Sequence, residues 1–311
     1  MAADHGPRVT DFISGVGREV RADALWPCEP WARWLAKMKP LFTLLLSIGW
    51  LTMAASWTHA ASPNLAPAVA PDILVVRDGW EEDRDTVRAV LESAAGELWK
   101  YVPNRPLPPI VVYPQGGPMT LYQRGPDGEI FVHLASRGSY WAQYAFQFSH
   151  EFCHILSNYR EEEHDHSWFE EALCELASLF VLRRMSETWT TSPPFEESED
   201  FAPALAEYAA NRVSGARLKP GQALSAWYAA YRLEHDDPLH DRHLHRVVAV
   251  ALLGLFEEAP SRWAAIATLN GNEPEKSRTL QEYFDGWSRR TPPRHRPVIG
   301  EIARLLVPSA E

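Results

Sequence analysis

The chain has 311 residues, of which 46% are hydrophobic and 23% are charged, so it can build one large domain or two smaller ones, each with a real core. Its formal net charge is −11. This balance argues against nucleic-acid binding, because binding to a phosphate backbone requires a basic surface.

Residues 38–60 have the pattern of a secretory signal peptide. Lys39 provides a basic start, an apolar run extends from Leu41 to Trp57, and small residues lead to Ala61. The run has 17 residues, fewer than the roughly 20 of a membrane-spanning helix. We therefore predict an exported protein, periplasmic or secreted. The alternative is a single-pass anchor, which would keep the protein at a membrane.

Residues 1–37 stand in front of this segment and carry scattered acidic residues without a long apolar period. A signal peptide acts at the N-terminus, so we predict that Met38 is the true start and that residues 1–37 are an upstream extension. A cytoplasmic tail ahead of an anchor is the alternative. Residues 61–71 are rich in Ala and Pro and are typical of a linker.

The remaining chain changes from strand patterns to helix patterns. Short apolar runs and turn signals predict strands at 73–77, 108–113 and 129–134, with 119–123 able to pair with the last as a hairpin. Helical patterns cover 80–101, 140–159, 167–188, 201–213, 238–256, 261–269, 275–287 and 297–307. We expect an α+β fold, with a short mixed or antiparallel sheet in a catalytic core (72–200) and a helical C-terminal subdomain (201–311).

The most informative segment is HEFCH, residues 150–154, inside the second predicted helix. Residues four apart lie on one face of a helix, so His150 and His154 can face one metal ion. Glu151 lies about 100° further round, where a carboxylate can accept a proton from a water molecule as a general base. The pattern predicts a zinc hydrolase, and the alternative is two helix histidines that serve only structure.

A catalytic zinc needs a third protein ligand and an open position. The next predicted helix begins SWFEEALCE, residues 167–175, and offers Glu170 and Glu171. If Ser167 is the N-cap, Glu170 closes a capping box on the backbone of Ser167, which leaves Glu171 to face the histidines. We therefore predict Glu171 as the ligand and keep Glu170 as the alternative.

Glu175 lies one turn after Glu171, on the same helix face and among apolar neighbours. Zinc-bound histidines usually donate their second N–H to a carboxylate or a carbonyl. We predict that Glu175 orients His150. The alternative is a solvated acidic residue on the helix surface.

HEFCH followed by WFEEALCE resembles the gluzincin branch of zinc metallopeptidases, with a thermolysin-like or peptidase-MA-like fold. The resemblance covers about residues 129–182. It implies Zn²⁺ as cofactor and a peptide or protein as substrate. It also implies that the metal ligands are His150, His154 and Glu171. In the same pattern Glu151 is the general base, and Glu175 supports the first histidine ligand. It also implies that an edge strand, here 129–134, binds substrate backbone, and an ordinary core strand is the alternative. A second function class is a zincin-like protein that binds a partner or an envelope component without turnover.

Two features depart from the resemblance. Only 16 residues separate His154 from Glu171, and no exopeptidase motif precedes the first helix. The residue that stabilises the oxyanion is not identified by any motif. Its candidates are Tyr228, Tyr231, His235, His240, His243 and His245.

Cys153 and Cys174 each follow a predicted ligand by three residues. They are therefore expected at the interface of the two motif helices. We predict free thiols there, and a disulfide is the alternative.

Overall fold

The computed structural model describes residues 70–76, 78–102, 105–161, 164–271 and 279–308. The predicted upstream extension, the signal peptide and nearly all of the linker lie outside these residues. Residues 65–311 group into one compact unit. None of the helices in the described part of the chain combines the length and the hydrophobicity that a membrane-spanning helix requires.

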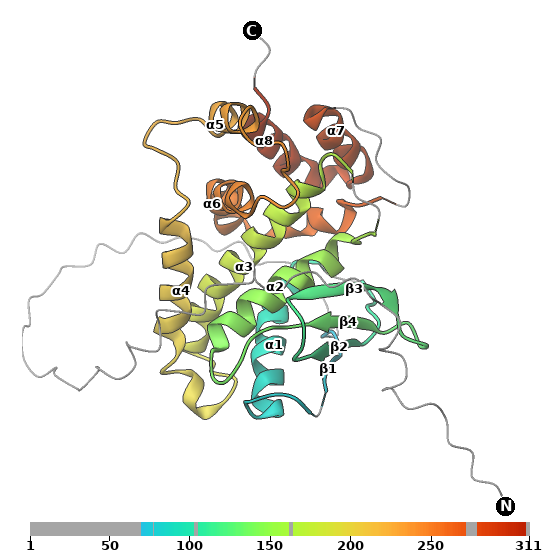
Figure 1. The fold of residues 1–311 in the computed structure, drawn as a ribbon, viewed down its shortest axis with the longest axis vertical. Helices are drawn as coiled ribbons and strands as arrows, with labels where there is room; N and C mark the ends of the chain where they lie inside the picture. Colours follow the sequence, from blue (N-terminus) through green and yellow to red (C-terminus); the bar gives the residue numbers. More distant parts are fainter. Residues whose placement is uncertain (1–69, 77, 103–104, 162–163, 272–278, 309–311) are drawn as a thin grey trace, which may run out of the picture. The chain divides into compact units, whose positions relative to one another are not determined.

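The fold is α+β, with a small mixed sheet followed by a mainly helical part (Figure 1). The sheet has the order β1-β2-β4-β3. Its strands are β1 (Ile73–Val75), β2 (Ile110–Tyr113), β3 (Met119–Arg124) and β4 (Ile130–His133). The first three strands in this order pair in parallel, and β3 pairs with β4 in the antiparallel sense. Alternate residues of β2 and β4 are buried, as expected for strands with one face on a core.

The hairpin decides which strand lies at the edge. β4 is paired on both sides, by β2 and by β3, so the segment predicted to be a substrate-binding edge is a core strand. β3 is the terminal strand of the described sheet, and Met119 and Tyr122 on it are exposed. Of the two alternatives kept open for 129–134, the ordinary core strand is the one observed, because the strand 119–124 pairs on the outside of β4 and covers it.

The helices follow the predicted order, with shifted ends and one addition. The α-helices are α1 (Arg84–Trp99), α2 (Trp141–Ser157), α3 (Ser167–Trp189), α4 (Ala202–Ser214), α5 (Leu224–Arg232), α6 (Arg242–Glu258), α7 (Leu280–Arg290) and α8 (Arg296–Leu306). Short 3₁₀ segments are η4 (Glu196–Ser198), η5 (Pro260–Thr268) and η6 (Pro293–His295). Helix α5 was not predicted, and the segment predicted as a helix over 261–269 is the 3₁₀ segment η5.

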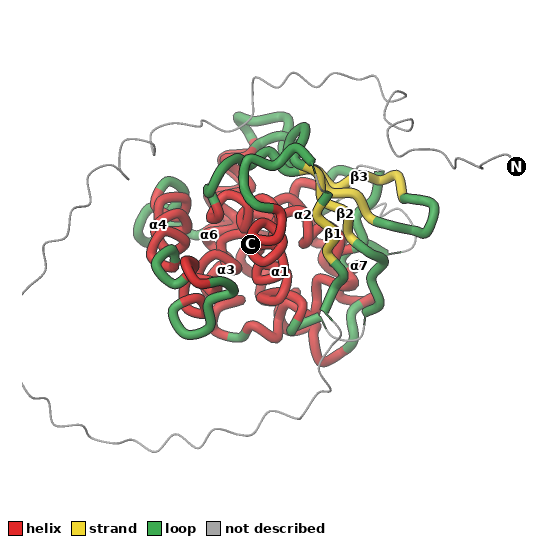
Figure 2. Tube along the Cα trace, turned by 90° about the horizontal axis from the view of Figure 1, so that it is seen from below, coloured by secondary structure: helices red, strands yellow, loops and turns green. Residues whose placement is uncertain are grey.

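Helices α2 and α3 form the centre of the fold, and Figure 2 shows them among the other helices beside the sheet. Both are apolar on most sides: Phe148 and Phe152 of α2 and Phe169 and Phe180 of α3 have no exposed surface. Helices apolar all round are found in protein interiors. Helix α1 packs on both, and α4 and α6 pack on α3.

The end of α2 is fixed by its cap. Asn158 adopts the left-handed conformation, with φ of 61°, and its backbone N–H bonds to the carbonyls of His154 and Ile155. Asn is one of the few residues that accept this conformation at a helix C-terminus. Its side-chain amide donates to the carbonyl of Ala267 at 3.0 Å, and its side-chain oxygen accepts from Arg105. The last turn of the motif helix is therefore tied to chain segments on either side of it in sequence.

Candidate metal centre

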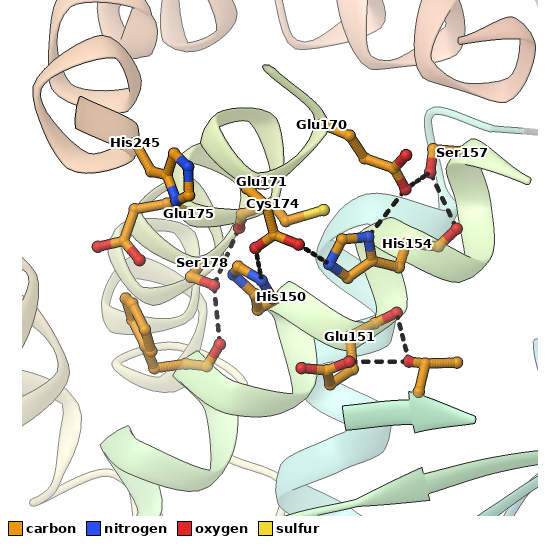
Figure 3. Close-up of polar contacts among 12 residues, drawn as sticks. His150, Glu151, His154, Ser157, Glu170, Glu171, Cys174, Glu175, Ser178 and His245 are labelled. Carbon is orange, nitrogen blue, oxygen red and sulfur yellow. Dashed lines mark hydrogen bonds and ion pairs between the residues drawn. The ribbon is translucent and has the colours of Figure 1, made fainter. Parts of the chain in front are cut away.

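Three predicted ligands converge between α2 and α3 (Figure 3). One oxygen of Glu171 lies 3.1 Å from Nε2 of His150, and the other lies 3.3 Å from Nε2 of His154. The two imidazole rings come from successive turns of α2, with centroids 5.0 Å apart. Their side chains are only 20% and 15% exposed, so the three groups meet in a partly enclosed space.

Glu170 binds the ring nitrogen of His154 that is not directed at Glu171. Its Oε1 accepts from Nδ1 of His154 at 2.8 Å and from the hydroxyl of Ser157 at 2.7 Å. Its Oε2 accepts from the amide of Asn270 at 2.7 Å. Because Nδ1 carries the proton in this hydrogen bond, Nε2 of a neutral His154 presents its lone pair to the space that Glu171 faces.

The capping-box argument for choosing between the two glutamates was wrong. Helix α3 begins at Ser167, its N-cap is His166, and no side chain caps it. The hydroxyl of Ser167 instead accepts from the backbone N–H of His164. Glu171 does face both histidines, but the reason is that Glu170 is drawn to His154, Ser157 and Asn270.

The histidines and glutamates of this site shift each other's pKa values. Burial raises the pKa of Glu171, but His154 and His150 more than offset this and hold it well below its ordinary value. Burial lowers the pKa of His154, yet Glu171 and Glu170 hold it well above its ordinary value. In the metal-free protein, Glu170 and Glu171 therefore favour the protonated form of His154, and a metal ion bound here would displace that proton.

Glu151 lies on the sheet side of α2 and is 4% exposed. The hydroxyl of Thr120, on edge strand β3, donates to its carboxylate at 2.9 Å. Burial raises the pKa of Glu151, and His150, His154 and the Thr120 hydrogen bond offset only part of this. A carboxylate with a raised pKa is suited to accept a proton near neutral pH and to give it back.

Glu175 does not occupy the position predicted for it. It is buried, as expected, but among the described residues its hydrogen bonds go to Arg212 of α4 at 3.3 Å and Arg246 of α6 at 3.4 Å. These contacts join three helices. The prediction failed because the arginines come from helices whose packing on α3 cannot be read from the local sequence.

The candidates for oxyanion stabilisation are spread over α5, α6 and their connection. Tyr228 stacks on Trp168, and Tyr231 stacks on His235 while its hydroxyl donates to Asp241.

The remaining candidates are histidines. His240 pairs with Asp237 in an exposed turn, and His243 lies near Trp227 and Tyr231. His245 is buried, its Nε2 donates to the carbonyl of Pro238 at 2.8 Å, and Figure 3 shows it beside Glu175. Burial lowers the pKa of His245 and Glu171 opposes this, so among these candidates His245 lies close enough to the proposed ligands to interact with them electrostatically.

The donor set fits zinc. Two imidazole nitrogens and a carboxylate are the ligands of one common class of catalytic zinc site, which leaves a position open. The hydrogen bond from His154 to Glu170 supplies the outer carboxylate that such histidines ordinarily have. The residues present therefore suit a zinc ion held by His150, His154 and Glu171.

A second grouping includes sulfur. Potential ligand atoms of His150, His154 and Cys174 all lie within 4.8 Å of one another. Cys153 and Cys174 are free and fully buried, as predicted. Burial and a hydrogen bond with Cys153 raise the pKa of Cys174 well above its ordinary value, so the thiol carries its proton in the metal-free protein.

Three site residues were missed by the sequence analysis: Thr120, Ser157 and Asn270. Ser157 lies three residues after His154 and so could have been placed near it. Thr120 and Asn270 lie 31 and 100 residues from their partners Glu151 and Glu170, and no local pattern connects them.

Comparison with known protein families, with curated protein sequences and with solved structures finds no match to this chain. The resemblance to gluzincins thus depends on the sequence motif alone.

Proposed function

We propose that this chain is a zinc-dependent hydrolase that cleaves amide bonds in a peptide or protein. One observation carries the proposal: both Nε2 atoms of the His150–His154 pair meet the Glu171 carboxylate, with Glu151 on the same helix. A structural zinc site has no need of an acid in the position of Glu151. A hydrolase needs one to handle protons.

The roles of the residues follow from their contacts. His150, His154 and Glu171 would hold the ion, with Glu170 fixing the ring of His154. When bound, zinc lowers the pKa of water toward about 7 and polarises a carbonyl group. Glu151, steadied by Thr120, would take a proton from the attacking water and deliver it to the leaving amine.

A peptide substrate is supported by the position of β3. This strand has a neighbour on one side only in the described sheet, and its Thr120 touches Glu151. A strand edge can bind an extended peptide by backbone hydrogen bonds. The substrate strand expected at 129–134 is therefore proposed at 119–124 instead.

Export is part of the proposal and depends only on residues 38–60. N-terminal sequencing of the protein recovered outside the cytoplasm tests it. A mature start near Ala61 supports cleavage of a signal peptide, and an intact residue 38 contradicts it.

The test of function combines metal analysis with a Glu151→Gln variant. We expect one zinc per chain in both proteins, and a loss of peptide hydrolysis of about 100- to 10,000-fold in the variant, the usual contribution of a general base. The assay uses labelled casein and a library of quenched peptides. Glu207→Gln is the matched control, because Glu207 is exposed on α4 and should leave zinc and activity unchanged.

The outcomes separate the alternatives. Stoichiometric zinc in a wild-type protein that cleaves none of the peptides favours the partner-binding function. Absence of stoichiometric zinc in the wild-type protein contradicts both functions and leaves two structural histidines.

A further inference from the structure

The proposed function leaves the Cys174 side chain unused, although this side chain lies beside the metal space. It comes from α3, three residues after Glu171, so both side chains leave the same face of the helix. In Figure 3 its sulfur points toward the space shared by the Glu171 carboxylate and the His154 ring.

The distances suit coordination. Zn–S and Zn–N bonds of about 2.3 and 2.0 Å place sulfur and nitrogen ligands roughly 3.5 Å apart in a tetrahedron. The sulfur of Cys174 already lies within 4.8 Å of a ring nitrogen on each of His150 and His154. Side-chain movements of about 1 Å would therefore bring the three atoms to this separation.

We propose that Cys174 is a fourth metal ligand, which closes the site in the resting protein; this inference rests on the metal site of the proposed function. On coordination the S–H bond breaks, the sulfur keeps the electron pair and donates it to the ion, and the proton leaves to solvent. A site with four protein ligands has no open position for water. Hydrolysis then requires that substrate or water displace the thiolate.

Cys153 supports this arrangement. It lies on the facing turn of α2, is fully buried and hydrogen-bonds Cys174. Its S–H would donate to the coordinated thiolate, which is the kind of outer contact that metal ligands ordinarily have. A thiolate among the ligands also shifts the site toward softer ions such as Zn²⁺ and away from Mg²⁺.

The test uses cobalt(II) chloride as the probe, because a cobalt–thiolate bond gives a charge-transfer band in the near ultraviolet and a cobalt–carboxylate bond does not. The full chain is stripped with a chelator and loaded with one equivalent of cobalt. We expect the band in the wild type, its loss in Cys174→Ser, and its retention in Cys153→Ser, a matched control with the same burial. The set is repeated with Cys28→Ser, because Cys28 is the third cysteine of the chain.

The outcomes distinguish this inference from the proposed function. Stoichiometric cobalt without the band, or a band that survives Cys174→Ser, overturns the fourth ligand and leaves the three-ligand site standing. Failure of the wild type to bind cobalt or zinc overturns both. The band without hydrolysis of any peptide supports the fourth ligand and contradicts only the enzyme.

A second measurement guards against a variant that does not fold. X-ray absorption of the zinc-loaded wild type should show one sulfur neighbour at about 2.3 Å. A shell of nitrogen and oxygen alone overturns the inference without any substitution.

Discussion

Glu170 and Glu175 are two buried carboxylates on α3 that lie on either side of Glu171 in sequence, and they have different partners. Glu170 accepts hydrogen bonds from a ring N–H, a hydroxyl and an amide. Glu175 accepts from two guanidinium groups. The first set of partners includes a predicted metal ligand, and the second set belongs to α4 and α6.

The difference shows that distance along the helix does not decide which acid supports the metal site. The partners decide it. A carboxylate that accepts from a ring N–H can fix the orientation of that imidazole. A carboxylate bound to two arginines is already neutralised and instead joins the helices that carry them. The same residue type thus serves the proposed chemistry at 170 and the fold at 175.

The largest expected effect is on stability, in Glu175→Gln. This change leaves Arg212 and Arg246 without their carboxylate, and we expect the free energy of unfolding to fall by about 3 kcal/mol, the lower end for breaking a buried ion pair. Urea unfolding of the metal-free protein measures it, with the exposed Glu207→Gln as control. Zinc affinity should stay unchanged. A fall in zinc affinity without a fall in stability would assign Glu175 to the histidines after all.

Glu170→Gln should have the converse effect. The variant keeps the size of the side chain but loses the charge that accepts from His154, so we expect zinc affinity to fall by about 10- to 100-fold. Competition with a zinc-binding dye measures it, beside Glu175→Gln as the contrasting variant. Equal zinc affinities in the two variants would remove the distinction between these carboxylates.

Much of the fold could be predicted from local patterns, because its elements are long and regular. The apolar stripe of α1 and the many apolar residues along α2 and α3 indicate helices directly. The edge of the sheet could not be predicted, since pairing order depends on contacts between segments. Helix α5 was missed because it is short, with 9 residues, and Leu224 is its one buried residue.

The residues of the candidate metal site also divide into those that local sequence patterns predict and those that depend on distant segments. His150, His154 and Glu171 were placed by spacing along two helices, which is local information. Glu175 was assigned to the wrong partner, and Asn270 was missed, because both interactions join α3 to segments that are distant in sequence. Local sequence therefore identified the inner residues of the site and failed for the residues that support them.

Asn270→Ala tests whether the C-terminal part of the chain acts on the site through Glu170. Its amide donates to Glu170, and loss of this bond should weaken zinc binding by about fivefold, or about 1 kcal/mol. The effect should largely disappear in a Glu170→Gln background, because the partner is already altered there. Zinc affinities of the two single variants and the double variant give the coupling. Additive effects would mean that Asn270 acts by another route.

Ser157→Ala should have the smallest effect on zinc affinity, and its effects on affinity and on stability should have opposite signs. The hydroxyl lies 2.7 Å from Glu170 and 2.9 Å from the carbonyl of His154, so it can be satisfied in two ways. We expect zinc affinity to fall by about twofold, the lower end for one hydrogen bond. Ala is also the better helix former, by up to about 0.7 kcal/mol, so the midpoint temperature of thermal unfolding of the metal-free protein should not fall. A fall in zinc affinity without a fall in stability would mean that Ser157 acts on the metal site together with Glu170. A parallel fall in both would make Ser157 a packing residue of α2.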